Sequence, residues 1–192
     1  MEATPIAAGK SSFGLIDQQA FLASLPINQD TVLLDAGCGV GHYTIFLAPH
    51  VPKGRIYAID LWKEGISRLE ERIKEAQITN VIPICCDLSK ELPLEDNSID
   101  LCLMATVLHD LVQDRTHLGT ISEIKRVLKP QGILSVVEFK KIDGPPGPPR
   151  AIRLSRDEVE DIVKQFRFSP IGDSVIGEFH YMVNFILNPA TN

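Results

Sequence analysis

Short, continuously apolar runs alternate along the chain with longer segments in which apolar residues recur every three or four positions. The first pattern is typical of strands buried on both faces, and the second is typical of helices with one buried face. Their alternation predicts βαβ units, and hence a mostly parallel sheet with helices on both faces. The predicted strands of this part are Thr31–Asp35, Arg55–Asp60, Val81–Cys85, Ile99–Met104 and Gly132–Phe139.

The segments around these strands carry signals of their own. Ser155, with Glu158 three positions later, forms a capping box that predicts the start of a helix. Pro83 places its strand near an edge of the sheet, because proline cannot donate a hydrogen bond to a neighbouring strand. Residues 169–187 predict an antiparallel strand pair joined around Gly177, which completes a Rossmann-like α/β fold with a seven-stranded sheet. The predicted helices are Leu15–Ala23, Lys63–Ala76, Arg115–Leu128 and Ser155–Phe166.

Length and composition narrow the class of protein. The chain has 192 residues, of which 44 % are hydrophobic, so we expect one structural domain with a sizeable core. The net charge of −6 argues against a surface that coats nucleic acid. No apolar run is long enough to span a membrane, and Met1–Gly9 lacks the basic and apolar regions of a signal peptide. The four cysteines form no C-x-x-C pair, so we expect a reduced, cytoplasmic protein without a metal site.

The segment Asp35-Ala36-Gly37-Cys38-Gly39-Val40-Gly41 leads from a predicted strand into a helix. Three glycines at alternate positions exceed what a tight turn needs, and they predict a loop whose backbone amides approach a ligand. His42 stands where the nucleotide-binding pattern G-x-G-x-x-G requires glycine. Asp60 ends the next strand, at a position where an acidic residue binds the two hydroxyl groups of a ribose.

Asp35 distinguishes between the ligands that such a loop can bind. A carboxylate immediately before the loop repels a pyrophosphate and favours a cationic ligand. A nucleoside that has a ribose and a positive charge but no phosphate is S-adenosylmethionine. A nicotinamide-dependent oxidoreductase shares the fold class and remains the alternative, although Asp35 and His42 argue against it.

Several motifs, taken together, resemble the class I S-adenosylmethionine-dependent methyltransferases. Residues 35–41 resemble their motif I, Cys86-Asp87-Leu88 resembles the loop after their third strand, and Glu123–Gly132 resembles the helix before their fifth strand, with Gln131 where glycine is common. Residues 104–111 are similar to the small-molecule branch that includes the ubiquinone and menaquinone biosynthesis methyltransferases. The Asn/Asp-Pro-Pro-Tyr/Phe motif of nucleic-acid amino-group methyltransferases is absent there.

The resemblance implies S-adenosylmethionine as the cofactor, and methyl transfer to a small-molecule acceptor by in-line displacement. It also implies that Asp60 binds the ribose, that Leu61 lines the adenine pocket, and that Asp87 hydrogen-bonds the adenine amino group. A protein that binds S-adenosylmethionine without catalysis is a further alternative. The expected cofactor-binding residues are Asp35, Gly37, Cys38, Gly39, Asp60, Leu61, Asp87, Leu88 and Ala105.

His109 is the candidate general base, because it follows the fourth predicted strand near the expected position of the methyl group. Asp110 could orient it or balance its charge. The other interpretation is that His109 caps a turn or packs at the rim of the cofactor site. A base is needed only if the acceptor loses a proton during the transfer.

Three further residues are candidates for contact with the acceptor. Phe13 belongs to residues 1–28, which we expect to form a helical lid over residues 29–192, the methyltransferase domain. Arg150 ends a proline-rich loop after the fifth strand that could wall the acceptor site, where Arg150 or Arg153 would bind an anionic substrate. The alternative is that the loop is only a rigid surface connector with solvated arginines. Tyr181 resembles part of a His-Tyr pair of some small methyltransferases, although core packing explains it equally well.

Overall fold

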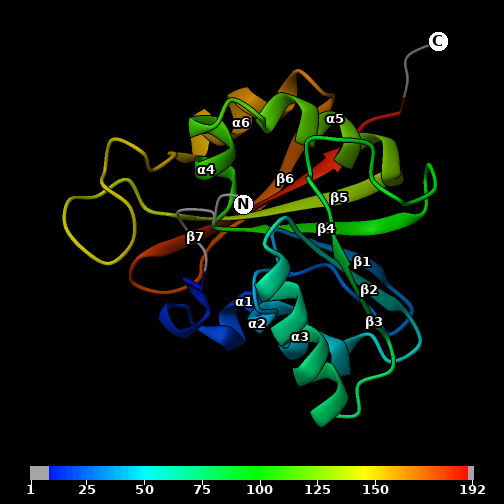
Figure 1. Ribbon diagram of the computed structural model, residues 1–192. Helices are drawn as coiled ribbons and strands as arrows, with labels where there is room; N and C mark the ends of the chain where they lie inside the picture. The colour runs from blue at the N-terminus through cyan, green and yellow to red at the C-terminus, as the bar shows by residue number, and fades with distance from the viewer. Residues whose placement is uncertain (1–8, 190–192) are drawn as a thin grey trace.

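A seven-stranded sheet forms the middle layer of the computed structural model, which describes residues 9–189 (Figure 1). Its strand order is β3-β2-β1-β4-β5-β7-β6. The first five strands in this order are parallel, whereas β7 runs antiparallel to both β5 and β6, so the predicted topology is confirmed. The strands are β1 (Val32–Ala36), β2 (Arg55–Asp60), β3 (Val81–Cys85), β4 (Ile99–Ala105), β5 (Leu128–Phe139), β6 (Phe168–Val175) and β7 (His180–Leu187).

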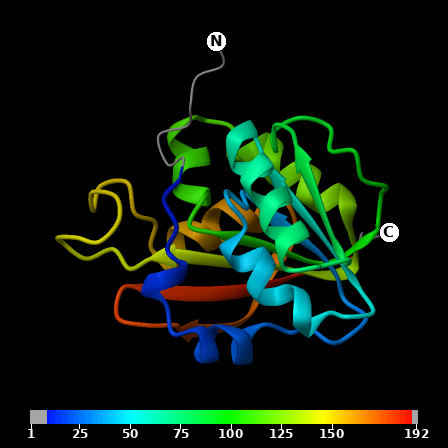
Figure 2. The ribbon, with the colours of Figure 1, turned by 60° about the horizontal axis from the view of Figure 1, so that its bottom comes forward.

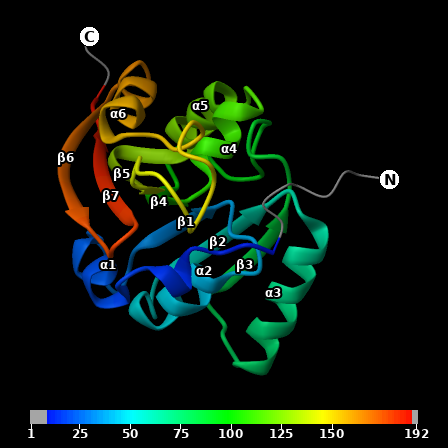
Figure 3. The same ribbon diagram turned by 90° about the vertical axis from the view of Figure 1, so that its left-hand side faces the viewer.

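Helices cover both faces of the sheet (Figures 1 and 3). One face carries α1 (Gln18–Ser24), α2 (His42–Leu47) and α3 (Lys63–Glu75), together with the short 3-10 helices η1 (Phe13–Leu15) and η2 (Ala48–His50). The opposite face carries α4 (Leu108–Gln113), α5 (His117–Val127) and α6 (Arg156–Lys164). Within residues 9–189, no helix is both long and apolar enough to cross a bilayer.

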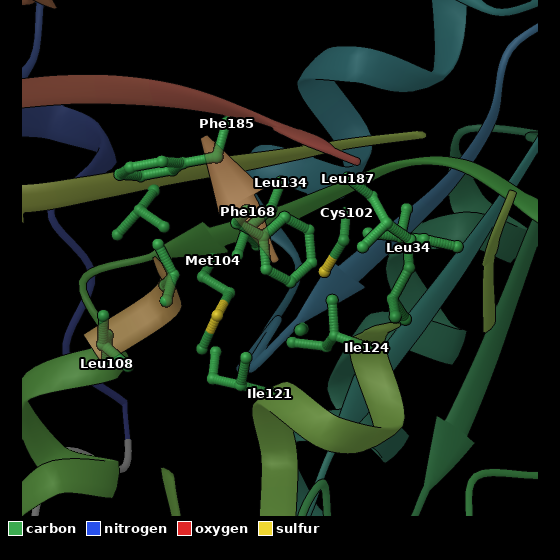
Figure 4. Packing of buried hydrophobic residues seen from close by; sticks show 14 of the residues in the cluster. Leu34, Cys102, Met104, Leu108, Ile121, Ile124, Leu134, Phe168, Phe185 and Leu187 are labelled. Carbon is green, nitrogen blue, oxygen red and sulfur yellow. The ribbon is translucent and has the colours of Figure 1, made fainter. Parts of the chain in front are cut away.

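Alternating side chains of the central strands divide the core into two halves. Leu101 and Leu103 of β4 pack with the layer of α1, α2 and α3, whereas Cys102 and Met104 pack with the layer of α4, α5 and α6. Figure 4 shows Met104 above Ile121 of α5 in the second half. These side chains are buried, and burial of one such apolar side chain contributes about 1.5–3 kcal/mol to folding. The two-sided burial explains why the central strands have continuously apolar sequences.

Side-chain caps set the beginnings of two helices. The capping box of α6 is confirmed, since the Ser155 amide donates to Glu158 Oε2 at 2.7 Å and the Glu158 amide donates to Ser155 Oγ at 3.3 Å. The first predicted helix begins later than expected, because the Asp17 carboxylate accepts the amide hydrogens of Gln19 and Ala20 and caps α1 there. Residues 13–15 form the separate helix η1 instead.

The segment between β4 and β5 differs most from the prediction. The expected helix Arg115–Leu128 begins at His117, and the short helix α4 before it was not predicted. Strand β5 begins at Leu128, which pairs with Ile99, and the register then shifts before the two strands pair regularly again. Gln131 lies in this irregularity with φ +65°, a conformation that favours glycine. Gln131 therefore adopts a backbone conformation that glycine adopts without strain.

Candidate functional site

A cavity of about 260 Å³ opens at the carboxyl ends of the first four strands. Parallel α/β sheets bind ligands at this edge, because the strand-to-helix loops converge there. The walls are the loop after β1 (residues 37–40), the first turn of α2 (residues 42 and 43), the end of β2 (residues 60–62), the loop after β3 (residues 87–88), the end of β4 (residues 105–107), part of residues 110–116, and residues 9–12.

The glycine loop after β1 is held by the end of β2. The amide groups of Gly37 and Cys38 donate to the Ile59 carbonyl oxygen at 2.8 and 3.1 Å, and the Gly39 amide donates to Asp60 Oδ2 at 2.7 Å. The expectation that this loop offers its amides to a ligand is therefore wrong for these three groups, since each already has an acceptor. A phosphate-binding loop needs such amides free, so the arrangement favours a ligand without phosphate.

Gly39 and Gly41 serve different purposes in this loop. Both have positive φ, at +55° and +76°, where a side chain adds strain. A Cβ atom at Gly41 would lie 2.3 Å from the Leu69 side chain, so this glycine allows α3 to pack against the loop. A Cβ atom at Gly39 would meet no atom within 4 Å, because Gly39 borders the open cavity.

Asp60 lines the cavity with a carboxylate whose orientation is set by the backbone. Its Oδ2 accepts from the Gly39 amide at 2.7 Å, and its Oδ1 accepts from the Trp62 amide at 2.8 Å. Each carboxylate oxygen can accept more than one hydrogen bond, so both can still accept from vicinal hydroxyl groups of a ligand. Trp62 borders the cavity too, and it also packs against Gly65 in the first turn of α3.

Asp35 differs from Asp60 because it is buried beneath the loop. Its carboxylate accepts a hydrogen bond from Thr44 Oγ1 of α2, and it does not belong to the cavity wall. Burial raises the pKa of Asp35 to about 7, although the Thr44 hydrogen bond opposes this shift. Asp35 is therefore not positioned to contact a ligand in this cavity directly.

The other residues expected to bind the cofactor share this one cavity. Asp87 lies at its rim, where Oδ1 accepts from the amide and hydroxyl groups of Ser89 at 2.8 and 2.7 Å. The individual roles of these side chains toward a cofactor stay predictions. The lining residues of the expected set are Gly37, Cys38, Gly39, Asp60, Leu61, Asp87, Leu88 and Ala105.

His109 is buried against β5 and does not line the cavity. Its side chain is only 5 % exposed, and its Nδ1 lies 2.8 Å from Glu138 Oε2. The backbone amide of His109 also donates to Glu138, at 3.1 Å from Oε1. The neighbouring Asp110 does line the cavity. A direct catalytic role of His109 stays a prediction, and the geometry places Asp110 on the cavity wall instead.

The three residues proposed to contact the acceptor lie outside the cavity wall. Phe13 packs against Tyr43 and Phe46, with ring centroids 5.0 and 5.2 Å apart. Tyr181 is buried and donates its hydroxyl hydrogen to the Leu154 carbonyl oxygen at 2.8 Å. The Arg150 side chain is 59 % exposed, and its Nη1 lies 3.7 Å from Asp143. Their contact with an acceptor therefore stays a prediction without geometric support.

Of the expected lid, residues 1–28, only a short part borders the cavity among the described residues. Residues 1–8 lie outside the described part of the chain, and residues 9–12 line the cavity. Helix α1, however, lies beside β7 and away from α4 (Figure 2). Asn184 of β7 donates to the Ser24 carbonyl oxygen at 2.8 Å, and Phe21 is buried in the core. The apolar face of α1 therefore covers the sheet rather than the ligand crevice.

Arg153 holds the proline-rich loop together from the inside. Its buried guanidinium group donates to five carbonyl oxygens at 2.5–3.2 Å, those of residues 140, 142, 144, 146 and 148. A guanidinium group has five N–H donors, so none remains for an anionic substrate. The idea that Arg153 binds such a substrate is therefore wrong. None of the loop residues 142–150 lines the cavity, which favours the interpretation of a rigid surface connector.

A cluster of three hydroxyl groups on the cavity wall was not predicted from the sequence. Ser12 Oγ lies 2.8 Å from the Tyr43 hydroxyl and 3.0 Å from Thr106 Oγ1, and all three residues line the cavity. Thr106 has φ +56°, which is a strained conformation for a β-branched residue. No sequence signal links Ser12 to Thr106, which is 94 residues away.

Glu138 was not predicted as a site residue, although an acid within an apolar strand is a recognisable signal. It is a fully buried acid within the apolar run of β5. A carboxylate at such a position needs a polar partner, because an unpaired buried charge is costly.

Within residues 9–189, no group of three or more His, Cys, Asp and Glu side chains is arranged to hold a metal ion.

The chemistry of the cavity fits S-adenosylmethionine. Asp60 and Asp87 supply acceptors for hydroxyl and amino groups, and Leu61 and Leu88 supply apolar contacts for a flat base. The amides of Gly37, Cys38 and Gly39 are occupied and are not available to a phosphate. A nucleoside without phosphate matches this set of groups better than a dinucleotide does.

Comparison with known proteins agrees with this geometry. A family model described as a methyltransferase domain matches residues 34–136. The demethylmenaquinone methyltransferase of Geobacillus sp. (strain WCH70) is 31 % identical over 106 residues, which are 55 % of this chain and 44 % of that protein. The tRNA N(3)-cytidine methyltransferase of Bos taurus is 25 % identical over 115 residues, which are 58 % of this chain and 30 % of that protein. The matches thus span less than half the length of either relative.

A solved structure extends the similarity to nearly the whole chain. The SAM-dependent methyltransferase from Aquifex aeolicus has a TM-score of 0.84 and 28 % sequence identity, with 93 % of each chain covered. The family model spans more than half of this chain, from β1 into β5, and includes every cavity residue except residues 9–12. The chain belongs to the class I S-adenosylmethionine-dependent methyltransferases.

Proposed function

We propose that this protein transfers a methyl group from S-adenosylmethionine to a small-molecule acceptor. The observation that carries this proposal is the pairing of an open carboxylate, Asp60, with a glycine loop whose amides are already bonded. That combination suits a ribose and rejects a pyrophosphate. Membership of the methyltransferase family supports the same donor.

In this proposal, different residues of the cavity bind different parts of the cofactor. Asp60 accepts hydrogen bonds from the ribose hydroxyls, and Asp87 accepts one from the adenine amino group. Leu61 and Leu88 enclose the adenine ring. When bound, the cofactor supplies a sulfonium methyl group, whose carbon takes the acceptor's lone pair while the carbon–sulfur electron pair returns to sulfur. The chain has to align the acceptor and exclude water, and alignment alone supplies much of the rate.

A small acceptor is favoured over a nucleic acid by the charge of the cavity. Asp110 and Asp114 lie on its wall, and the whole chain carries a net charge of −6. Both features repel a phosphate backbone, which nucleic-acid-binding surfaces attract with basic residues. The relative from Geobacillus is named for a small molecule, demethylmenaquinone, whereas the relative from Bos taurus is named for tRNA. The charge of the cavity favours the first kind of acceptor.

Calorimetry with purified protein tests the ligand class. We expect S-adenosylmethionine and S-adenosylhomocysteine to bind with micromolar affinity, and NADH to show no binding. If the folded protein binds neither sulfur compound, the proposed function is wrong.

A transfer assay separates the enzyme from a protein that only binds the cofactor. Methyl-labelled donor is incubated with phenols, amines, thiols and quinols, and with bulk tRNA as the competing class. Transfer to a small acceptor supports the proposal, whereas transfer to tRNA alone contradicts it. Cofactor binding without transfer to any of these acceptors would favour the non-catalytic alternative.

A further inference from the structure

Two carboxylates and the imidazole ring between them extend from the interior of the protein to the cavity. Glu138 is fully buried on β5, His109 is almost fully buried at the start of α4, and Asp110 is 31 % exposed. His109 Nδ1 lies 2.8 Å from Glu138 Oε2, and its Nε2 lies 3.6 Å from Asp110 Oδ1. Only Asp110 of the three belongs to the cavity wall.

The buried end of this line determines the state of the imidazole ring. Glu138 has three contacts with His109, because Oε1 accepts from the backbone amide and the ring Nδ1 lies 3.1 and 2.8 Å from Oε1 and Oε2. An ionised carboxylate can only accept hydrogen bonds. The Nδ1 atom therefore carries a hydrogen and donates it to Glu138. In the neutral ring, Nε2 is then left as an acceptor, and it points toward Asp110.

The position of Asp110 along the cavity follows from the strand order. The two acids expected at the nucleoside, Asp60 and Asp87, follow β2 and β3, which lie on one side of β1. Asp110 follows β4, on the other side of β1. A ligand whose nucleoside lies over β2 and β3 extends toward β4, so its reactive end and the acceptor approach Asp110.

We propose, on the basis of the proposed function, that Asp110 is the residue that takes the proton of the acceptor, and that the acceptor is a compound that loses a proton on methylation, such as a hydroxyl or amine compound. The proton moves from the acceptor atom to a carboxylate oxygen of Asp110, which becomes a neutral acid. It passes on to His109 Nε2, and the resulting imidazolium is held by the Glu138 carboxylate. Charge is conserved at each transfer, and water removes the proton after the reaction. His109 and Glu138 are positioning residues.

The electrostatic surroundings agree with this geometry. Burial lowers the pKa of His109, but the hydrogen bond and charge of Glu138 outweigh it, so the pKa is raised overall. Burial raises the pKa of Asp110, which brings the two groups closer in proton affinity. Lys10 and Asp114 act on Asp110, and Arg153 acts on His109. The gap of 3.6 Å exceeds a hydrogen bond, as is common for catalytic contacts before substrates bind.

The position of Asp110 can be tested without a known acceptor, by comparing two cofactor analogues. Sinefungin carries a protonated amine where the methyl group would be, and S-adenosylhomocysteine carries nothing there. Asp110→Asn removes the charge and keeps the shape of the side chain. It should therefore reduce the affinity for sinefungin about tenfold and leave the affinity for S-adenosylhomocysteine unchanged. Asp114→Asn is the matched control, because it removes a carboxylate from the same stretch of the cavity wall, and it should leave the ratio of the two affinities unchanged.

The coupling of His109 to Glu138 and to Asp110 is measured through the protonation of its ring. The His109 ring is titrated by nuclear magnetic resonance in the wild type, in Glu138→Gln and in Asp110→Asn. Both variants should lower the pKa of His109, because each removes a negative charge beside the ring. Thermal unfolding of each variant shows whether it remains folded.

The outcomes distinguish this inference from the proposed function. If the wild type binds neither analogue, the proposed function is wrong. If both analogues bind and Asp110→Asn changes their affinities equally or not at all, Asp110 does not face the transferred group, and the inference is overturned. An unchanged His109 titration in Asp110→Asn would likewise disconnect the imidazole from the cavity and overturn the proton path.

Discussion

Gly39 donates its amide hydrogen to Asp60 Oδ2 at 2.7 Å, which joins the glycine loop after β1 to the acid at the end of β2. The two motifs lie 21 residues apart and behave as one hydrogen-bonded unit. The bond orients the carboxylate toward the cavity and removes an amide that could bind phosphate. Cofactor selection therefore depends on the pair rather than on either motif alone.

Replacement of Asp60 tests this unit directly. Asp60→Ala should weaken the binding of S-adenosylhomocysteine by about 1–3 kcal/mol, because the ribose hydroxyls lose charge-assisted hydrogen bonds. Calorimetry measures the change. Asp143→Ala is the control, because that acid is exposed on the proline-rich loop and should leave the affinity unchanged. Equal affinities of Asp60→Ala and the wild type would place the ribose elsewhere.

Asp35 should make the folded protein less stable as the pH rises. Its pKa is about 7 in the folded state and 3.8 in the unfolded chain, so the folded state holds an extra proton between these values. Stability therefore falls as the pH rises from about 4 to 7, by up to about 4 kcal/mol. Asp35→Asn keeps an acceptor for Thr44 and should lack this decline. Urea unfolding at pH 5 and pH 8 measures it, and identical pH slopes in variant and wild type would contradict the prediction.

His180 should make the protein sensitive to acid. Burial lowers its pKa to about 4, although the Leu15 backbone partly opposes this shift. The unfolded chain takes up this proton near pH 6.5, so stability falls as the pH drops from 6.5 to 4, by about 3 kcal/mol. His180→Leu should reduce this loss, as measured by urea unfolding at pH 4.5 and pH 7. His50→Leu changes an exposed histidine and should leave the loss intact.

Arg153 should stabilise the protein without contributing to cofactor binding. Arg153→Lys keeps the charge but removes most of the five carbonyl contacts, so we expect a loss of about 2–4 kcal/mol in the free energy of unfolding. Limited proteolysis should cut residues 142–150 faster, while the affinity for S-adenosylhomocysteine stays the same. Arg150→Lys is the matched control and should change neither measurement. A large loss of affinity in Arg153→Lys would mean that the loop supports the cavity.

Local sequence patterns were sufficient for most of the fold. The alternation of strands and helices, the capping box at Ser155 and the antiparallel tail depend on neighbouring residues, and all three were predicted. Boundaries were wrong where a distant or irregular contact intervened, as at Leu128, which pairs with Ile99 across a shifted register. The helix α4 is too short to show a periodic apolar pattern, so it was missed.

The sequence by itself determined where the ligand-binding edge lies, because glycines and acids at strand ends must meet there in any parallel α/β sheet. Only the tertiary structure decided which side chains face the ligand. Glu138 pairs with His109 across 29 residues and draws its imidazole into the interior, which leaves Asp110 on the cavity wall. Arg153 turns inward in the same way, because five carbonyl oxygens of its own loop surround it. A buried polar group is oriented by the partners that offset its desolvation, and no local pattern identifies those partners.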